Sequence, residues 1–251
     1  MHRLAGKVAL VTGAGQGVGQ GIAFALAADG AAVAVTGRTL SKVEQTAAEI
    51  ERRGGRALAL ACDVKDAAAV ADCVSQVVAR LGGLNILVNN AQEVPLGTLL
   101  NVSDAAFAAG WDSGPLATFR LMKLAHAHLK GDGCIVNLAS PAAHRWDASG
   151  YGAYGAVKEA IRQLTRAAAC EWARDGIRTN AILPLGNSPA MDGWTRARPQ
   201  EAAAFIATVP MQRVGDCETD IGRFVATLCS DDCRYINGQS IAVDGGQAYL
   251  G

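Results

Sequence analysis

VALVTGAGQGVG, residues 8–19, joins a short apolar run to a turn with four glycines. The run is too short for a helix and lacks polar alternation, so it predicts a buried parallel strand. In such a strand-turn-helix unit, backbone N–H groups and the positive helix end face a pyrophosphate, and glycine allows its close approach. A tight turn or close helix packing would also use glycine. We expect a dinucleotide site formed by Thr12, Gly13, Gly15, Gln16, Gly17, Val18 and Gly19.

The strand-then-helix order repeats along the chain. Further short apolar runs predict strands at residues 32–35, 57–61, 86–88, 135–138, 179–183 and 240–243. Ala-rich segments of helical period lie between them, at 21–29, 41–53, 67–81, 103–129 and 154–175. Because right-handed crossovers put helices on both faces of the sheet, we expect a doubly wound α/β fold of about seven parallel strands, with a ligand crevice at the strand ends.

Composition favours one domain over residues 1–251. Half of the residues are apolar, which is enough for a large core, and no linker or repeat marks a boundary. The 23 basic and 23 acidic residues are spread along the chain, a pattern that indicates neither nucleic-acid binding nor an anionic membrane surface. Small-molecule partners are favoured. Without a leader or a membrane-length apolar segment, we expect a cytoplasmic protein.

The seven cysteines are scattered and form no CxxC pair. We interpret them as reduced thiols that serve packing. Metal binding is the alternative for Cys229 and Cys233, but a spacing of four without histidine neighbours is poor ligand geometry. No metal site is predicted.

The second strand ends with Arg38 and offers no carboxylate there. Dinucleotide folds usually place an acidic residue about 20 positions after the glycine turn, on the adenosine ribose. A planar guanidinium would instead pair with a 2′-phosphate, which favours NADP(H) over NAD(H). A solvated loop arginine is the alternative.

Three motifs follow later strands in order: Asn89-Asn90-Ala91 after the fourth, Ser140 after the fifth, and Tyr154-Gly-Ala-Val-Lys158 at the start of a long helix. With the glycine turn and the ending YINGQ at 235–239 and VDGG at 243–246, this order resembles the short-chain dehydrogenase/reductase family across essentially the whole chain. The resemblance implies a Rossmann-type domain and an NAD(P)-dependent oxidoreductase, commonly a homodimer or homotetramer that associates through the helices at 103–129 and 154–175.

The resemblance also implies residue roles. Ser140 would position the substrate carbonyl, Tyr154 would be the acid/base, and Lys158 would hold the nicotinamide ribose. The remaining cofactor contacts would be Asp63 and Val64 at the adenine, Asn89 and Ala91 beside the fourth strand, and Pro184 and Ser188 at the nicotinamide.

The chemistry of this pair is consistent with its spacing. Tyr154 and Lys158 are four residues apart and share a helix face, so we expect the ammonium to favour the phenolate and, together with an oxidised nicotinamide ring, to lower the tyrosine pKa. Ser140 adds a hydrogen bond at the oxygen where charge develops. The alternatives are an exposed tyrosine–lysine pair and a serine that caps a turn.

Three positions depart from the family pattern. Gln92 replaces a glycine and either lines the substrate pocket or points to the surface. Gly114 stands where the family has a catalytic asparagine, and Leu185 stands where glycine commonly follows Pro184. Pro115 has no N–H for the preceding turn. We hypothesise a kink there, in which the carbonyl of Trp111 or Gly114 holds a water that relays protons to Lys158; a weakened relay is the alternative.

Residues 188–214 combine apolar side chains with polar ones and are interpreted as a substrate lid, or else as a helical pair over the core edge. The candidate pocket residues are Gln92, His144, Arg145, Trp146, Met191 and Trp194. The expected reaction is hydride transfer between NADP(H), with NAD(H) possible, and a secondary alcohol or ketone. Two alternatives stay open: a site that acts on an activated double bond, and a non-catalytic dinucleotide-binding regulator.

Overall fold

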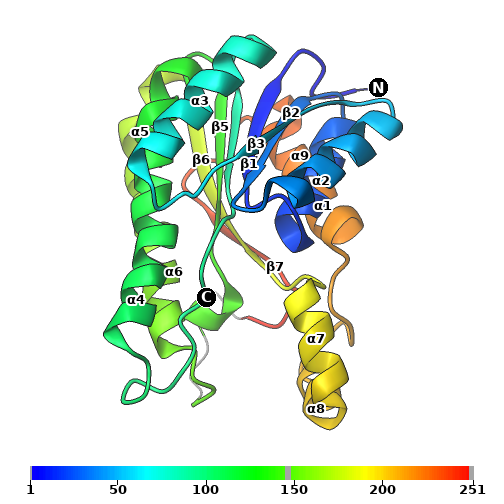
Figure 1. The fold of residues 1–251 in the computed structure, drawn as a ribbon, viewed down its shortest axis with the longest axis vertical. Helices are drawn as coiled ribbons and strands as arrows, with labels where there is room; N and C mark the ends of the chain where they lie inside the picture. The colour runs from blue at the N-terminus through cyan, green and yellow to red at the C-terminus, as the bar shows by residue number, and fades with distance from the viewer. Residues whose placement is uncertain (1, 145–147, 249–251) are drawn as a thin grey trace.

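The seven predicted strands form one parallel sheet in the order β3-β2-β1-β4-β5-β6-β7 (Figure 1). The computed structural model describes residues 2–144 and 148–248. The strands are β1 Val8–Thr12, β2 Ala32–Gly37, β3 Arg56–Ala61, β4 Ile86–Asn89, β5 Gly133–Leu138, β6 Ile177–Pro184 and β7 Ser240–Val243. Every neighbouring pair is parallel. The prediction of a single doubly wound Rossmann-type domain is confirmed.

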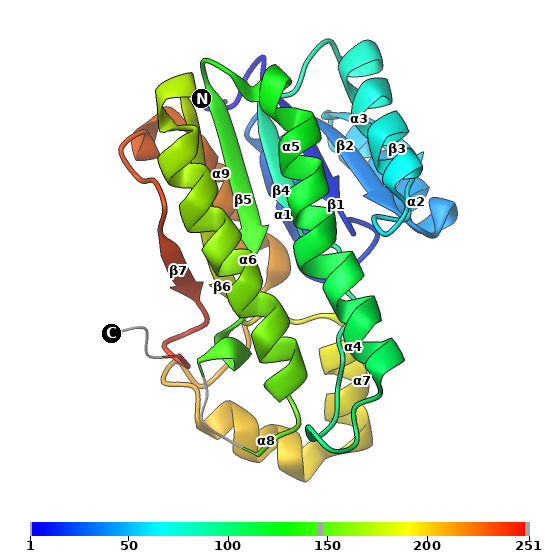
Figure 2. The same cartoon turned by 90° about the vertical axis from the view of Figure 1, so that its left-hand side faces the viewer.

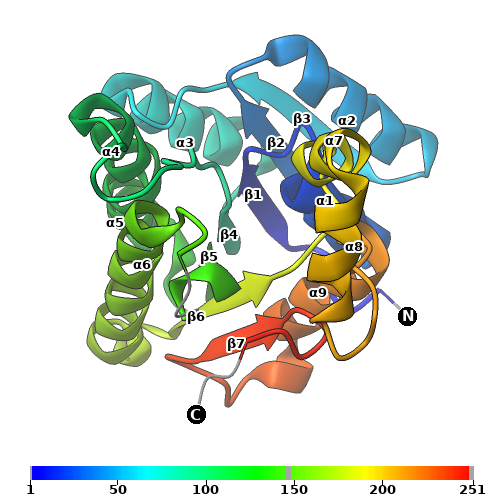
Figure 3. The same cartoon turned by 90° about the horizontal axis from the view of Figure 1, so that it is seen from below.

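Helices cover both faces of the sheet, as Figures 2 and 3 show from the side and from below. Their bounds are α1 Gly17–Ala28, α2 Leu40–Arg52, α3 Ala67–Leu81, α4 Asp104–Trp111, α5 Ala117–Leu129, α6 Gly152–Glu171, α7 Pro189–Ala197, α8 Pro199–Ala207 and α9 Arg223–Cys229. Helices α1, α2 and α9 enclose one apolar core against the sheet. Helices α3 and α5, with α6 beside them, enclose the other. Central strands are therefore buried on both faces, which explains their lack of polar alternation.

The long segment predicted at 103–129 is interrupted. Helix α4 ends at Trp111, a π-helical turn follows at Asp112–Leu116, and α5 begins at Ala117. Pro115 lies inside this turn. A second π-helical turn, Cys217–Gly222, precedes α9 and was not predicted. Each wide turn admits one extra residue per turn, and such turns are frequent at functional sites.

All strands end at the same edge of the sheet, so the residues that follow them meet there. Strands β1 to β3 are added toward one side of the sheet and β4 to β7 toward the other, so the strand order reverses between β1 and β4. Doubly wound sheets form their ligand crevice at this point. Helices α7 and α8 lie beyond this edge (Figures 1 and 3). Among residues 2–144 and 148–248, none of the helices has the length and apolarity that crossing a bilayer requires. The cysteines are free thiols.

Candidate active site

The glycine turn leaves no room for side chains at its glycine positions. Gly13 and Gly17 have φ of +64° and +60°, values that glycine adopts at little cost. A Cβ on Gly13 would lie 2.9 Å from the Cα of Ala91, and one on Gly15 would lie 2.9 Å from the Cβ of Lys42. Helix α1 begins at Gly17, so its free N–H groups face the same space. This cradle of backbone fits a pyrophosphate group.

Asn90 fixes the turn from the neighbouring strand. Its Nδ2 donates to the carbonyl oxygens of Thr12 and Gly13, at 2.8 and 3.1 Å. The Thr12 hydroxyl accepts in return from the backbone N–H groups of Asn90 and Ala91, at 3.0 and 3.1 Å. A Cβ on Gly19 would fall on the Asn90 amide. Asn90 was quoted in its motif but not predicted as a site residue, since its contact with the turn depends on strand pairing.

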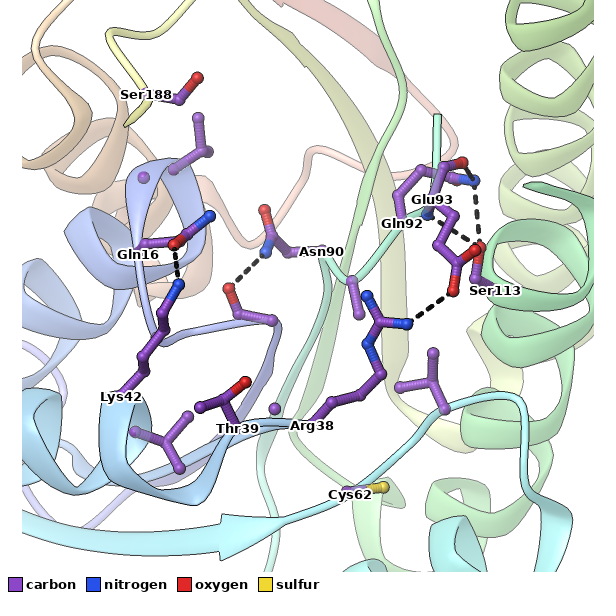
Figure 4. Close-up of a pocket in the computed structure, with 18 of the residues that line it drawn as sticks. Gln16, Arg38, Thr39, Lys42, Cys62, Asn90, Gln92, Glu93, Ser113 and Ser188 are labelled. Carbon is purple, nitrogen blue, oxygen red and sulfur yellow. Dashed lines mark hydrogen bonds and ion pairs between the residues drawn. The ribbon is translucent and has the colours of Figure 1, made fainter. Parts of the chain in front are cut away.

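A cavity of about 400 Å³ opens above the ends of β1, β2 and β4 (Figure 4). The predicted cofactor residues that line it are Gly13, Gly15, Gln16, Gly17, Val18, Arg38, Asp63, Val64, Ala91 and Ser188. The lining described for this cavity does not include Thr12, Gly19, Asn89, Tyr154, Lys158 or Pro184. Instead, Asn89 donates from Nδ2 to Asn137 Oδ1 inside the sheet, at 2.8 Å. The shape and backbone donors of the cavity fit the adenosine and pyrophosphate portion of a dinucleotide.

Charged side chains gather at one end of this cavity. Arg38 Nη1 and Lys65 Nζ each lie 2.8 Å from Glu93 Oε1. Lys42, in the first turn of α2, also lines the cavity and donates to Gln16 Oε1 at 2.8 Å. Figure 4 shows Arg38 extending across the cavity toward Glu93. Of these charged residues, only Arg38 was predicted from the sequence. Glu93 and Lys65 follow other strands, and the order of strands in the sheet brings them to this site.

The three predicted catalytic residues meet where β5 ends and α6 begins. Ser140 follows β5 and hydrogen-bonds to Tyr154. It also caps the short 3₁₀ turn Pro141–Ala143, accepting from the Ala142 N–H at 3.2 Å, so the capping alternative holds alongside the contact with Tyr154. Lys158 is buried, donates from Nζ to the Leu138 carbonyl at 2.6 Å, and lies 5.4 Å from the centre of the Tyr154 ring. The three side chains form one cluster at the carboxyl edge.

The predicted lowering of the Tyr154 pKa is wrong for the protein by itself. Burial raises the pKa of Tyr154 to about 12, although its hydrogen bond with Ser140 acts in the opposite direction. Burial also lowers the pKa of Lys158 to about 7. Both shifts have the same cause, because a desolvated site disfavours a charge on either group. The lysine therefore carries less of the positive charge that was expected to stabilise the phenolate.

Gln92 points inward and not to the surface. Its Nε2 donates to the carbonyl oxygens of Glu93 and Gly110, at 2.7 and 2.8 Å. Its Oε1 is buried and has no hydrogen-bond partner within the described residues. A Cβ on Gly114 would fall on this oxygen and lie 2.9 Å from Val157 Cγ1. The amide of Gln92 therefore occupies the space that a side chain at position 114 would need.

A π-helical turn surrounds Pro115, at the position where a kink was predicted. In it, Ala117 N–H donates back to the Asp112 carbonyl, five residues earlier. Pro115 has no N–H for the Trp111 carbonyl four residues earlier. The Gly110 carbonyl, just before the turn, accepts from the Gln92 amide. The relay water expected at the Trp111 or Gly114 carbonyl stays a prediction.

The candidate substrate residues do not form one apolar pocket. His144 contacts Arg162, and its Nε2 lies 3.5 Å from Glu159 Oε1. His144 therefore belongs to a polar cluster. Met191 lines a separate cavity between α7 and the segment after α8. Trp194 packs edge-on against Phe205, with ring centres 5.7 Å apart. Arg145 and Trp146 lie outside the described residues. Leu185 is buried and pairs with Val243 and Gly215 through its backbone.

A doubly wound parallel sheet, a glycine cradle at its first strand and a Ser-Tyr-Lys cluster beside it define a nicotinamide-dependent oxidoreductase. A family model described as enoyl-(acyl carrier protein) reductase matches residues 13–248. A 12alpha-hydroxysteroid dehydrogenase from Clostridium sp. is 37% identical over 250 residues, 96% of each chain. The chain belongs to the short-chain dehydrogenase/reductase family.

Solved structures share the whole fold. A short-chain dehydrogenase from Burkholderia cenocepacia in complex with NADP is 34% identical, covers 98% of this chain and 99% of its own, and has a TM-score of 0.91. A 7 alpha-hydroxysteroid dehydrogenase complexed with NADH and 7-oxo glycochenodeoxycholic acid is 28% identical, with coverage of 99% and 97% and a TM-score of 0.92. The chain therefore shares its whole fold with dehydrogenases of this family that bind NADP or NADH.

Proposed function

We propose that this protein transfers a hydride between NADP(H) and a secondary alcohol or ketone, with Tyr154 as the acid/base. One observation carries the proposal: the Tyr154 hydroxyl is hydrogen-bonded to Ser140, and buried Lys158 lies on the same helix face. These three groups can bind one carbonyl oxygen and exchange a proton with it.

The bound dinucleotide supplies the hydride and, when oxidised, a positively charged ring. In reduction, Tyr154 gives its phenolic proton to the carbonyl oxygen while Ser140 donates a hydrogen bond to the same oxygen. A pKa of about 12 keeps Tyr154 protonated at neutral pH, which is the form that donates. In oxidation the phenol must lose its proton first, so a positive charge near Tyr154 lowers its pKa and favours this direction. Lys158 holds the replacement proton beside it.

Charge at the adenosine end favours NADP(H) over NAD(H). Arg38 and Lys42 line the cavity, Lys65 shares the Glu93 carboxylate with Arg38, and β2 ends without a carboxylate. A 2′-phosphate is a dianion for which such a cluster is suited, and Arg38 can contact it with two N–H groups. The Burkholderia relative bound to NADP agrees with this proposal, whereas the NADH-bound relative keeps NAD(H) as the second choice.

One alternative reaction has a specific observation in its favour. The matching family model takes its description from a reductase of enoyl groups, which contain an activated carbon–carbon double bond. Such a reaction would need a proton donor aimed at carbon, whereas the hydrogen-bonded hydroxyls of Ser140 and Tyr154 are suited to bind one carbonyl oxygen. Intact Ser140, Tyr154 and Lys158 also argue against a non-catalytic regulator.

The test is nicotinamide absorbance with a panel of ketones, secondary alcohols and enoyl thioesters, each with NADP(H) and NAD(H). We expect turnover of a ketone or alcohol, and a loss of at least about a hundredfold in kcat for Tyr154→Phe, the scale of acid–base catalysis. Tyr151→Phe is the matched control, since Tyr151 is close in sequence but has glycine four residues later. Turnover confined to enoyl thioesters would favour the double-bond reaction; cofactor binding without any turnover would favour the regulator.

We also propose that the chain forms homo-oligomers through α4 and α5. These helices expose Phe107, Trp111, Phe119 and Leu124, each between 38% and 43% accessible. Several large apolar side chains exposed along neighbouring helical turns are typical of interaction surfaces. The lid at 188–214 likewise stays a proposal. It consists of α7 and α8, which pack on each other through Trp194 and Phe205 and lie beyond the carboxyl edge.

A further inference from the structure

Glu93 comes from the loop after β4, yet its side chain contacts residues that follow two other strands. Its Oε1 is 2.8 Å from Arg38 Nη1 and 2.8 Å from Lys65 Nζ. Arg38 follows β2 and Lys65 follows β3. A single carboxylate oxygen is therefore shared by both cations at the end of the dinucleotide cavity and offsets one of their two positive charges. Figure 4 shows its ion pair with Arg38 crossing that end.

The backbone of Glu93 is held in place by its neighbours. Its N–H donates to Ser113 Oγ at 2.9 Å, and its carbonyl accepts from Gln92 Nε2 at 2.7 Å. Only side-chain rotation can then move the carboxylate while these bonds last. The Glu93 side chain is 30% exposed and that of Arg38 is 61% exposed, so both reach solvent from the ion pair.

We propose that Glu93 competes with the 2′-phosphate of NADP(H) for Arg38 and Lys65, and thereby limits the preference for NADP(H) over NAD(H). This inference rests on the proposed function. A phosphate that contacts the Arg38 guanidinium meets the carboxylate already bound there, and two like charges so close repel strongly. Glu93 must therefore turn away when NADP(H) binds. NAD(H) has no 2′-phosphate, so it leaves both ion pairs intact.

A different role for Glu93 gives the opposite prediction for NAD(H). Carboxylates in dinucleotide folds often accept hydrogen bonds from the adenosine ribose hydroxyls. If Glu93 did so, its removal would weaken NAD(H) and AMP. The two ion pairs favour competition, because they already hold the Glu93 carboxylate against Arg38 and Lys65.

The experiment is calorimetric titration of wild type and Glu93→Gln with adenosine 2′,5′-bisphosphate and with AMP, two probes that differ only in the 2′-phosphate. We expect the bisphosphate to bind the variant about fivefold more tightly, the scale of partly exposed ion pairs. AMP should bind both proteins equally. Glu201→Gln is the matched control, since Glu201 pairs with Arg198 on α8, away from the cavity. Circular dichroism checks that each variant is folded.

Arg38→Gln completes the test. In an Arg38→Gln background, Glu93→Gln should no longer tighten the bisphosphate by the same factor, because the main contested cation is gone. The proposal is overturned if Glu93→Gln leaves the bisphosphate affinity unchanged, or if it weakens AMP. Failure of the proposed function looks different: wild type would then bind neither bisphosphate, AMP, NADP(H) nor NAD(H), and the inference would fall with it.

Discussion

Gly114→Asn should destabilise the protein, and Gln92→Gly should reverse much of that loss. A Cβ at position 114 falls on Gln92 Oε1 and lies 2.9 Å from Val157 Cγ1, closer than real Cβ contacts. The Gln92 amide cannot move aside freely, since its Nε2 serves the Glu93 and Gly110 carbonyls. Overpacking of this kind costs about 1–3 kcal/mol of unfolding free energy. For a chain of this size that lowers Tm by roughly 2–12 °C.

Gln92→Gly by itself has opposing effects. It removes two hydrogen bonds, worth about 0.5–1.5 kcal/mol each, and also removes a buried unpartnered oxygen, whose burial costs about 1–3 kcal/mol. The net change should therefore be small. The double variant has no steric conflict, so the coupling energy of the cycle should reach about 0.5–3 kcal/mol in favour of the pair.

Urea denaturation of all four proteins, followed by circular dichroism, measures this coupling. Gly193→Asn is the control, because nothing lies within 4 Å of a Cβ at that position and its backbone needs no glycine. Additive effects of the two substitutions, or a Gly114→Asn variant as stable as wild type, would refute the packing argument.

Two further predictions follow from the site. Lys158 has a pKa of about 7 when folded and an ordinary value of 10.5 when unfolded. Between these values the unfolded chain binds one more proton than the folded one. The unfolding free energy of wild type should therefore rise with pH relative to that of Lys158→Met, by up to about 1.4 kcal/mol per pH unit. Parallel curves of unfolding free energy between pH 7 and 9 would contradict the lowered pKa. Gly19→Ala should displace Asn90 and weaken dinucleotide binding by at least about tenfold. A tenfold change in Kd is about 1.4 kcal/mol, the scale of one lost hydrogen bond between uncharged groups. Gly193→Ala should leave the Kd unchanged, and equal Kd values for both variants would show that Asn90 does not position the turn.

The strands could be predicted from sequence because their cause is local. Each is a short apolar run between turn residues, and the run at 240–243 matches β7 at both ends. The glycine turn was readable for the same reason. The helix at 67–81 was also predicted with correct bounds, from its Ala-rich helical period. In the structure Asp66 caps its start and Gly82 ends it in the left-handed region, which are local causes as well.

The remaining features depend on contacts between distant segments. Gln92 is followed by polar and apolar residues alike, so nothing local indicates that its amide fills the space above Gly114. Glu93 is 55 positions from Arg38, and only the order of strands brings them together. The pKa of Tyr154 was predicted in the wrong direction because spacing reveals the nearby lysine but not the desolvation of both groups.

Asn90 has a consequence for how ligands are received. Because its amide and the Thr12 hydroxyl tie the first glycine turn to the fourth strand, the receiving backbone is already ordered in the free protein. Little flexibility is then lost on association, and more of the contact free energy appears as affinity. A loop of four glycines, the most pliable residue type, is thereby made into a rigid receptor by one side chain from outside it.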